Sequence, residues 1–132
     1  MRVVIFGTRP PEQIRSNPLR LSRWHLERVP QVASAVKESK FDVTLVLCGM
    51  AVGWDTIGKI WAVHNKIAVD EYPAEWRDTR GSYNRRAGLD RNVEMALDAD
   101  GGIGFWDKKS TGTKHMIGLL ERRKLPLLVV EI

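Results

Sequence analysis

The sequence predicts a single α/β domain with a Rossmann-like, three-layer architecture and a mainly parallel sheet of about five strands. Five short apolar runs alternate with helical patterns along the chain. The runs are mostly continuous rather than alternating, which is typical of strands buried on both faces of a parallel sheet. The chain has 132 residues, which suits one domain and leaves no room for a second.

The predicted elements follow one another in the order β-α-β-α-β-α-β-α-β, which implies right-handed crossovers. The expected strands are Arg2–Phe6, Val43–Cys48, Ile67–Tyr72, Gly102–Trp106 and Leu127–Ile132. The expected helices are Leu19–Lys40, Thr56–Asn65, Leu89–Leu97 and Thr113–Lys124. Pro30 lies inside the first helical pattern, so that helix either starts near Pro30 or kinks there. The longest irregular stretch is Pro73–Gly88, and loops of that length in compact domains are usually functional.

Composition excludes several classes of protein. Hydrophobic residues make up 43% and charged residues 28%, which argues against disorder. The single cysteine, Cys48, excludes a disulfide framework and is expected in the core. The apolar runs are too short for a transmembrane helix or a signal peptide, so we expect a cytoplasmic protein without a membrane partner. His25, His64 and His115 lack metal-ligand spacing, and we expect neither a metal nor a cofactor.

Positive charge is concentrated in two segments. The formal net charge is +5; residues 1–42 carry eight Lys/Arg against four Asp/Glu. Residues 73–92 carry five arginines against three acidic residues. This distribution suits an anionic small ligand or a nucleic-acid backbone, with a solubilising surface as the alternative.

In open parallel sheets, ligands bind beyond the carboxyl ends of the strands, so the residues after each strand are the informative ones. The first strand is followed by Gly7, Thr8 and Arg9. The glycine permits a tight turn, and the arginine can hold a phosphate or carboxylate in a bidentate manner. The alternative is an ordinary turn with a surface arginine.

The second strand is followed by Gly49-Met50-Ala51-Val52-Gly53-Trp54-Asp55. Its two glycines flank a helix start, where free N–H groups favour anions. Asp55 would lie in the first helical turn, where it could accept from ribose hydroxyls or simply cap the helix.

The third and fourth strands are also followed by polar segments. Glu75 is a candidate acid or base, and Trp76 could stack on a base or pack on the body of the protein. Small hydroxyl residues surround Gly112 between Ser110 and Thr113, which predicts a phosphate cradle or an ordinary N-cap. The candidate ligand-binding residues are Gly7, Thr8, Arg9, Gly49, Met50, Ala51, Gly53, Asp55, Glu75, Trp76, Arg86, Arg91, Asn92, Trp106, Ser110, Thr111, Gly112 and Thr113.

Two common nucleotide-binding motifs are absent. No Gly-Lys-Ser/Thr sequence occurs, so the chain is not a P-loop NTPase. The first turn lacks G-x-G-x-x-G, which argues against the dinucleotide site of ordinary dehydrogenases.

The motifs as a set resemble the YspA-like (cpYpsA-related) branch of the SLOG superfamily. They are Gly7-Thr8-Arg9, the segment Gly49–Asp55, Pro73-Ala74-Glu75-Trp76, Ala87-Gly88-Leu89-Asp90-Arg91-Asn92 and Thr111-Gly112-Thr113. The resemblance spans nearly the whole chain and implies a Rossmann-like domain that binds nucleotides or their derivatives. Distant relatives include the Lonely Guy phosphoribohydrolases, DprA, which binds single-stranded DNA, and proposed nucleotide sensors.

The chain departs from this pattern at four positions. Met50 replaces a glycine, Glu75 an aspartate and Leu89 a proline. Met116 occupies the position at which Lonely Guy enzymes carry the glutamate that supports hydrolysis, so their mechanism does not transfer whole.

Three functions follow from these features. The first is binding of a nucleotide or nucleotide-derived ligand, with Trp76 or Trp106 stacking on its base and Arg86, Arg91 and Asn92 closing the site. The second is an N-glycosidase that releases the base from a nucleoside 5′-monophosphate, with Asp55 or Glu75 as the carboxylate. The third is single-stranded DNA binding by tryptophans and positive charge. A homo-oligomer is also expected, with Trp24 and Leu26 as a possible apolar face.

Overall fold

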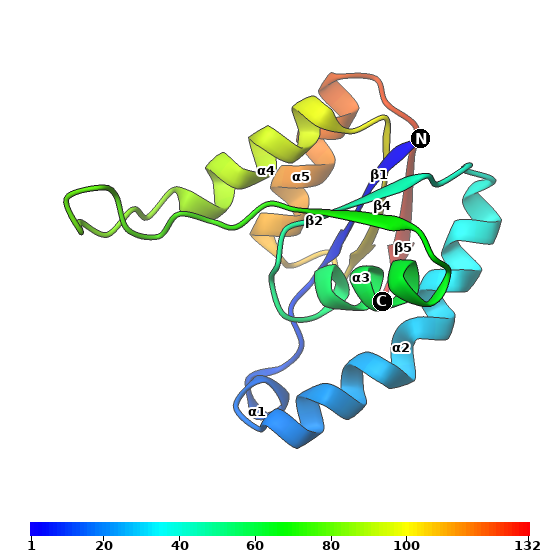
Figure 1. The fold of residues 1–132 in the computed structure, drawn as a ribbon, viewed down its shortest axis with the longest axis horizontal. Coiled ribbons are helices and arrows are strands. Elements are labelled where there is room, and N and C mark those ends of the chain that lie inside the picture. Colours follow the sequence, from blue (N-terminus) through cyan, green and yellow to red (C-terminus); the bar gives the residue numbers. More distant parts are fainter.

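The computed structural model describes residues 1–132 and contains one five-stranded parallel sheet with five helices (Figure 1). The strands are β1 (Arg2–Gly7), β2 (Leu45–Cys48), β3 (Ala68–Glu71), β4 (Gly101–Trp106) and β5 (Leu127–Glu131). The helices are α1 (Glu12–Arg15), α2 (Pro18–Ser39), α3 (Trp54–His64), α4 (Ala87–Asp98) and α5 (Thr111–Arg122). The predicted Rossmann-like, three-layer α/β domain is confirmed.

The strand order β3-β2-β1-β4-β5 places β1 at the centre of the sheet. Val4 of β1 lies opposite Leu47 of β2 on one side and Gly102 of β4 on the other. The chain first adds β2 and β3 on one side of β1. It then returns to the centre of the sheet and adds β4 and β5 on the other side of β1. A crevice therefore opens beyond the carboxyl ends of β1 and β4, where the winding direction reverses.

Two hydrophobic cores flank the sheet, and alternate residues of β1 serve both. Val3 and Ile5 pack with residues of α2 and α3 on one face. Val4 and Phe6 pack with residues of α4 and α5 on the other. Figure 1 shows these two helix pairs on opposite sides of the sheet. Burial on both faces explains why this strand has a continuous apolar run.

Helix α2 begins at Pro18, so the alternative that it starts near Pro30 is wrong. The Asn17 side chain accepts a hydrogen bond from the Arg20 N–H, and Pro18 occupies the first helical position, where its missing N–H costs nothing. The helix continues through Pro30, and Figure 1 shows it bending along its length. Val32 and Ala35, beyond the proline, are buried against the sheet, which holds the second half of the helix in place.

Smaller differences lie at the element ends. The short helix α1 was not predicted, and α3, α4 and α5 each begin two residues earlier than the apolar pattern indicated. The segment between β3 and α4 has no helix or strand apart from one isolated bridge between Arg77 and Tyr83, and it projects from the body of the domain (Figure 1). None of the helices has the length and apolar character needed to cross a membrane.

Helix α3 lies against β1 only because residue 58 has no side chain. A Cβ added to Gly58 would lie 2.8 Å from Cβ and Cγ2 of Ile5, which is completely buried. We expect Gly58→Ala to lower the free energy of unfolding by about 1–3 kcal/mol through overpacking, despite alanine's better helix propensity. Urea unfolding measures the change.

The matched control is Gly112→Ala in α5. An added Cβ at Gly112 meets nothing within 4 Å, so this variant is expected to be neutral or slightly stabilising. Equal destabilisation by both substitutions would contradict the packing explanation.

Candidate functional site

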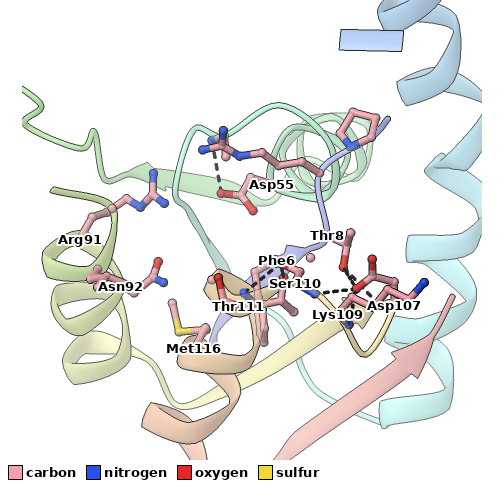
Figure 2. A pocket seen from close by; sticks show the side chains of 18 of the residues that line it. Phe6, Thr8, Asp55, Arg91, Asn92, Asp107, Lys109, Ser110, Thr111 and Met116 are labelled. Carbon is pink, nitrogen blue, oxygen red and sulfur yellow. Dashed lines mark hydrogen bonds between the residues drawn. The ribbon is translucent and has the colours of Figure 1, made fainter. Parts of the chain in front are cut away.

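A cavity of about 720 Å³ lies at the carboxyl ends of β1 and β4, in the crevice that the strand order creates (Figure 2). Its walls come from the turn after β1, the turn after β2, the loop before α4, and the start of α5. Segments that are distant in sequence therefore meet at one edge of the sheet.

Twelve of the eighteen candidate residues line this cavity. They are Gly7, Thr8, Arg9, Ala51, Asp55, Trp76, Arg91, Asn92, Ser110, Thr111, Gly112 and Thr113. The remaining six do not line it, and they are Gly49, Met50, Gly53, Glu75, Arg86 and Trp106. Glu75 and Arg86 are exposed, and neither lines the cavity.

The turn after β1 is tied to the loop after β4 through Asp107, a residue that sequence reasoning missed. The Thr8 hydroxyl and Asp107 Oδ1 are 3.2 Å apart, and the same oxygen accepts the N–H groups of Lys109 and Ser110 at 2.8 Å (Figure 2). These backbone hydrogen bonds hold the pKa of Asp107 below its usual value. The sequence feature that could have identified Asp107 is its position three residues before the helix N-cap Ser110, where an aspartate commonly accepts hydrogen bonds from the following N–H groups in an Asx turn.

The start of α5 presents free N–H groups to the cavity. The Ser110 side chain caps the helix by accepting from the Thr113 N–H. The N–H groups of Thr111 and Gly112 have no acceptor in the chain, and the space around Gly112 is open. Trp106 supports this loop from outside the cavity by donating from Nε1 to the Ser110 carbonyl at 3.1 Å. The loop thus offers an anion two unpaired donors.

Asp55 is a buried carboxylate at the start of α3, only 7% exposed. Its Oδ2 accepts the Ala51 N–H at 3.3 Å (Figure 2). An added Cβ at Gly49 would lie 2.6 Å from this oxygen, so Gly49 acts by leaving room for the carboxylate. Burial raises the pKa of Asp55 to about 6, although Arg91, the Ala51 N–H and Arg9 favour the charged form.

Helix α4 points two polar side chains into the cavity, Arg91 and Asn92 (Figure 2). Arg91 donates to the Gly49 carbonyl, which links α4 to the turn after β2. The Nε of Arg91 is buried and has no hydrogen-bond partner. Asn92 is 8% exposed, and its Nδ2 lies 3.4 Å from Nδ1 of His115.

The turn between Gly49 and Gly53 offers fewer free donors than its sequence suggested. The Gly53 N–H donates to Nε2 of His25 at 2.9 Å, so His25 is neutral, and burial lowers its pKa. The Ala51 N–H is already held by Asp55. Met50 adopts a left-handed conformation with φ 64°, a position that favours glycine, and its side chain is half-exposed.

Cys48 lies in the core, as predicted. It is 1% exposed, and burial raises the pKa of its thiol to about 11, so it does not serve as a nucleophile at neutral pH.

The cavity lining is strongly cationic. Arg9 and Arg91 are joined by three cations that sequence reasoning did not select, namely Arg15, Arg85 and Lys109. Against these five stand only the carboxylates of Asp55 and Asp107. Arg15 could not be foreseen because it lies on α1, whose four residues carry no apolar pattern.

One aromatic face accompanies this charge. Trp76 lines the cavity with 40% of its surface exposed and stacks against Tyr83, with ring centroids 6.1 Å apart and planes 11° from parallel. A planar group bound in the cavity would have an aromatic neighbour there.

Comparison of the chain with family models, curated proteins and solved structures returned no match. Fold and cavity together define the class, a Rossmann-like α/β domain with a cationic cleft at the point where the winding of the sheet reverses. No group of three or more His, Cys, Asp or Glu side chains is arranged to hold a metal ion.

The buried carboxylate of Asp55 is expected to cost stability at neutral pH. Because its pKa is raised from 3.8 to about 6, the wild type loses free energy of unfolding as pH rises through this interval. Asp55→Asn keeps an acceptor for Ala51 without the charge. It should therefore stabilise the protein at pH 7, by up to about 3 kcal/mol.

The measurement is urea unfolding of both proteins from pH 4 to pH 8, with exposed Asp90→Asn as control. His25 acts in the opposite direction, since its lowered pKa removes stability as pH falls below 6.5, so the difference between variant and wild type is the quantity to follow. A variant less stable than wild type at pH 7 would contradict the expectation.

Proposed function

We propose that the chain binds a phosphate-bearing nucleotide or nucleotide-derived ligand in the cavity at the carboxyl ends of β1 and β4. The observation that carries the proposal is the convergence of five cationic side chains with the free N–H groups of α5. Helix N-termini bind phosphate through free N–H groups, and arginine binds it through paired hydrogen bonds.

The cavity has chemically distinct ends, which favours a nucleotide over inorganic phosphate. Arg9, Lys109 and the start of α5 provide the phosphate end. Asp55 and Asn92, which are largely buried, offer an acceptor and an amide suited to ribose hydroxyls or a base edge. Trp76 offers a stacking face for the base. A volume of about 720 Å³ lies in the range of small-molecule sites.

The test is calorimetric titration with nucleoside mono-, di- and triphosphates, NAD and ADP-ribose. We expect one member of this set to bind, and Arg9→Ala to weaken its binding at least ~tenfold by removing a charged phosphate contact. Arg23→Ala on α2 is the matched control, because Arg23 is exposed and does not line the cavity.

Absence of binding by the whole set would overturn the proposal. If single-stranded DNA then bound with an affinity that fell steeply with added salt, the alternative of DNA binding would take its place.

A second candidate function, nucleotide N-glycosidase, is favoured by one observation. Asp55 is a buried carboxylate with a pKa of about 6 that lines the cavity, whereas Glu75 lies outside it. A carboxylate in this position could activate water or stabilise positive charge on the ribose as the base departs.

This activity is measured by chromatography of free base released from nucleoside 5′-monophosphates. We expect Asp55→Asn to reduce release at least ~100-fold while nucleotide binding persists, because general-base contributions are of that order. Glu75→Gln should leave release unchanged. Binding without any released base would restrict the protein to ligand binding.

A further inference from the structure

Strand β5 ends the sheet on one side, and its outer edge has no partner in the chain. It pairs only with β4, where the Gly102 N–H donates to the Pro126 carbonyl and the Ile132 N–H donates to the Trp106 carbonyl. Because the backbone groups alternate in direction along a strand, residues 126, 128, 130 and 132 face β4, and residues 127, 129 and 131 face outward. The N–H and C=O groups of these three outward residues make no hydrogen bond within the chain.

The two edges of the sheet differ in their protection against pairing. The opposite edge, β3, has only four residues, and two of them are the exposed carboxylates Asp70 and Glu71. Short length and charged side chains are common means by which edge strands avoid pairing with another chain. Strand β5 has the sequence Leu-Leu-Val-Val-Glu, so its only charge lies at its last residue. Its central residue, Val129, is 39% exposed. The edge of β5 is therefore the unprotected one.

The space beside β5 is open on the side of the sheet that α2 covers. A cavity of about 830 Å³ lies there, lined by Gln31, Ser34 and Glu38 of α2 and by the end of β5 from Val130 onward. Leu128 and Val130 pack on the core on this side but are only partly buried. A further strand along β5 would cover both side chains, and the cavity leaves room for its own.

The apolar face expected on α2 is a poorer contact surface than this edge. Trp24 is only partly exposed, and the Arg28 guanidinium lies over its ring at 4.0 Å from the ring centroid. Leu26 is 58% exposed, but it is left without that tryptophan as an accessible neighbour.

We propose that β5 pairs with β5 of a second copy of the chain, antiparallel about a two-fold axis at Val129, so that two five-stranded sheets become one of ten strands. In this register Val129 lies opposite Val129 of the second copy, and Leu127 lies opposite Glu131. These are the outward-facing residues, so every free N–H group of one edge meets a free C=O group of the other. Leu128 lies opposite Val130 on the α2 side.

Backbone chemistry calls for a strand at this edge, and symmetry favours a second copy. A row of free N–H and C=O groups is complementary to another extended backbone. The outward residues of β5 are arranged symmetrically about Val129, so the strand is complementary to itself. Its one charged residue, Glu131, faces Leu127 and not another carboxylate, so no like charges lie opposite each other. Such a contact is isologous, as in most homodimers.

The first experiment is sedimentation equilibrium of the wild-type chain and of Val129→Lys, with folding checked by circular dichroism. The wild type should be dimeric at micromolar concentration. The substitution places two like charges across the axis and should raise the dimer dissociation constant at least ~100-fold. Ala68→Lys is the matched control, because Ala68 is also exposed on an edge strand, and it should leave the dimer intact.

Amide hydrogen exchange followed by NMR tests the register of the pairing. The N–H groups of Leu127 and Val129 should be protected in the dimeric wild type and should exchange rapidly in Val129→Lys. The N–H groups of Leu128 and Val130 face β4, so they should stay protected in both proteins.

A thiol at the axis tests the geometry without adding charge. Val129→Cys introduces the one accessible thiol, because Cys48 is 1% exposed. Directly opposed residues that exchange hydrogen bonds have Cα atoms about 5.5 Å apart, a separation that a disulfide can span. Mild oxidation should therefore link two copies of Val129→Cys but not of Ala68→Cys.

A wild type that stays monomeric from micromolar to near-millimolar concentration would overturn the proposal and leave the edge to an extended segment of another protein. A dimer in which the Val129 N–H exchanges rapidly, or which is insensitive to Val129→Lys, would overturn it as well. No residue of β5 lines the cavity proposed for the nucleotide, and none of these measurements uses a nucleotide, so the interface and the proposed function can fail separately.

Discussion

The site depends on how β1 ends, at the centre of the sheet. Gly7, the last residue of β1, lies between the Phe105 carbonyl and the Trp54 ring. A Cβ added there would lie 2.6 Å from the Phe105 oxygen and 2.5 Å from Cδ1 of Trp54. Trp54 stacks on Phe105 at 3.9 Å and is the first residue of α3, so the same contact that confines Gly7 fixes the start of that helix. Asp55 follows directly, as the second residue of the helix whose start this contact fixes.

Several features around the cavity reduce stability in the free protein. Asp55 keeps a carboxylate in a buried position, Met50 adopts a backbone conformation suited to glycine, and Nε of Arg91 has no partner. Such departures from local preference concentrate where binding or chemistry takes place. The central strand has no such departure from local preference, since alternate residues of β1 fill two apolar cores.

The fold was predictable from the sequence because the central strands β1, β2 and β4 are buried on both faces and leave mainly apolar runs, whereas the edge strand β3 is largely exposed. Most of the site was predictable for a related reason, since strand ends in such a sheet converge on one edge. What sequence reasoning missed was particular hydrogen bonds. The Gly53 N–H donates to His25, which lies 28 residues earlier in the chain, and no pattern in the sequence marks that contact. Trp106 supports the loop before α5 by donating to the Ser110 carbonyl instead of facing the cavity. Arg15 lines the cavity from α1, a helix of four residues that has no periodic apolar pattern.

The projecting segment between β3 and α4 has a consequence for how the chain can be divided. It separates a first half, β1 to β3, from a second half, α4 to β5, and the two halves are joined across the sheet by the pairing of β1 with β4. Arg77, Arg80, Arg85 and Arg86 lie exposed along this segment, which makes it the natural place for trypsin to cut. A nicked chain would keep its central strand pair, and each fragment would still carry its own wall of the cavity. We therefore expect a chain cut in this loop to stay folded as a noncovalent complex of its two fragments.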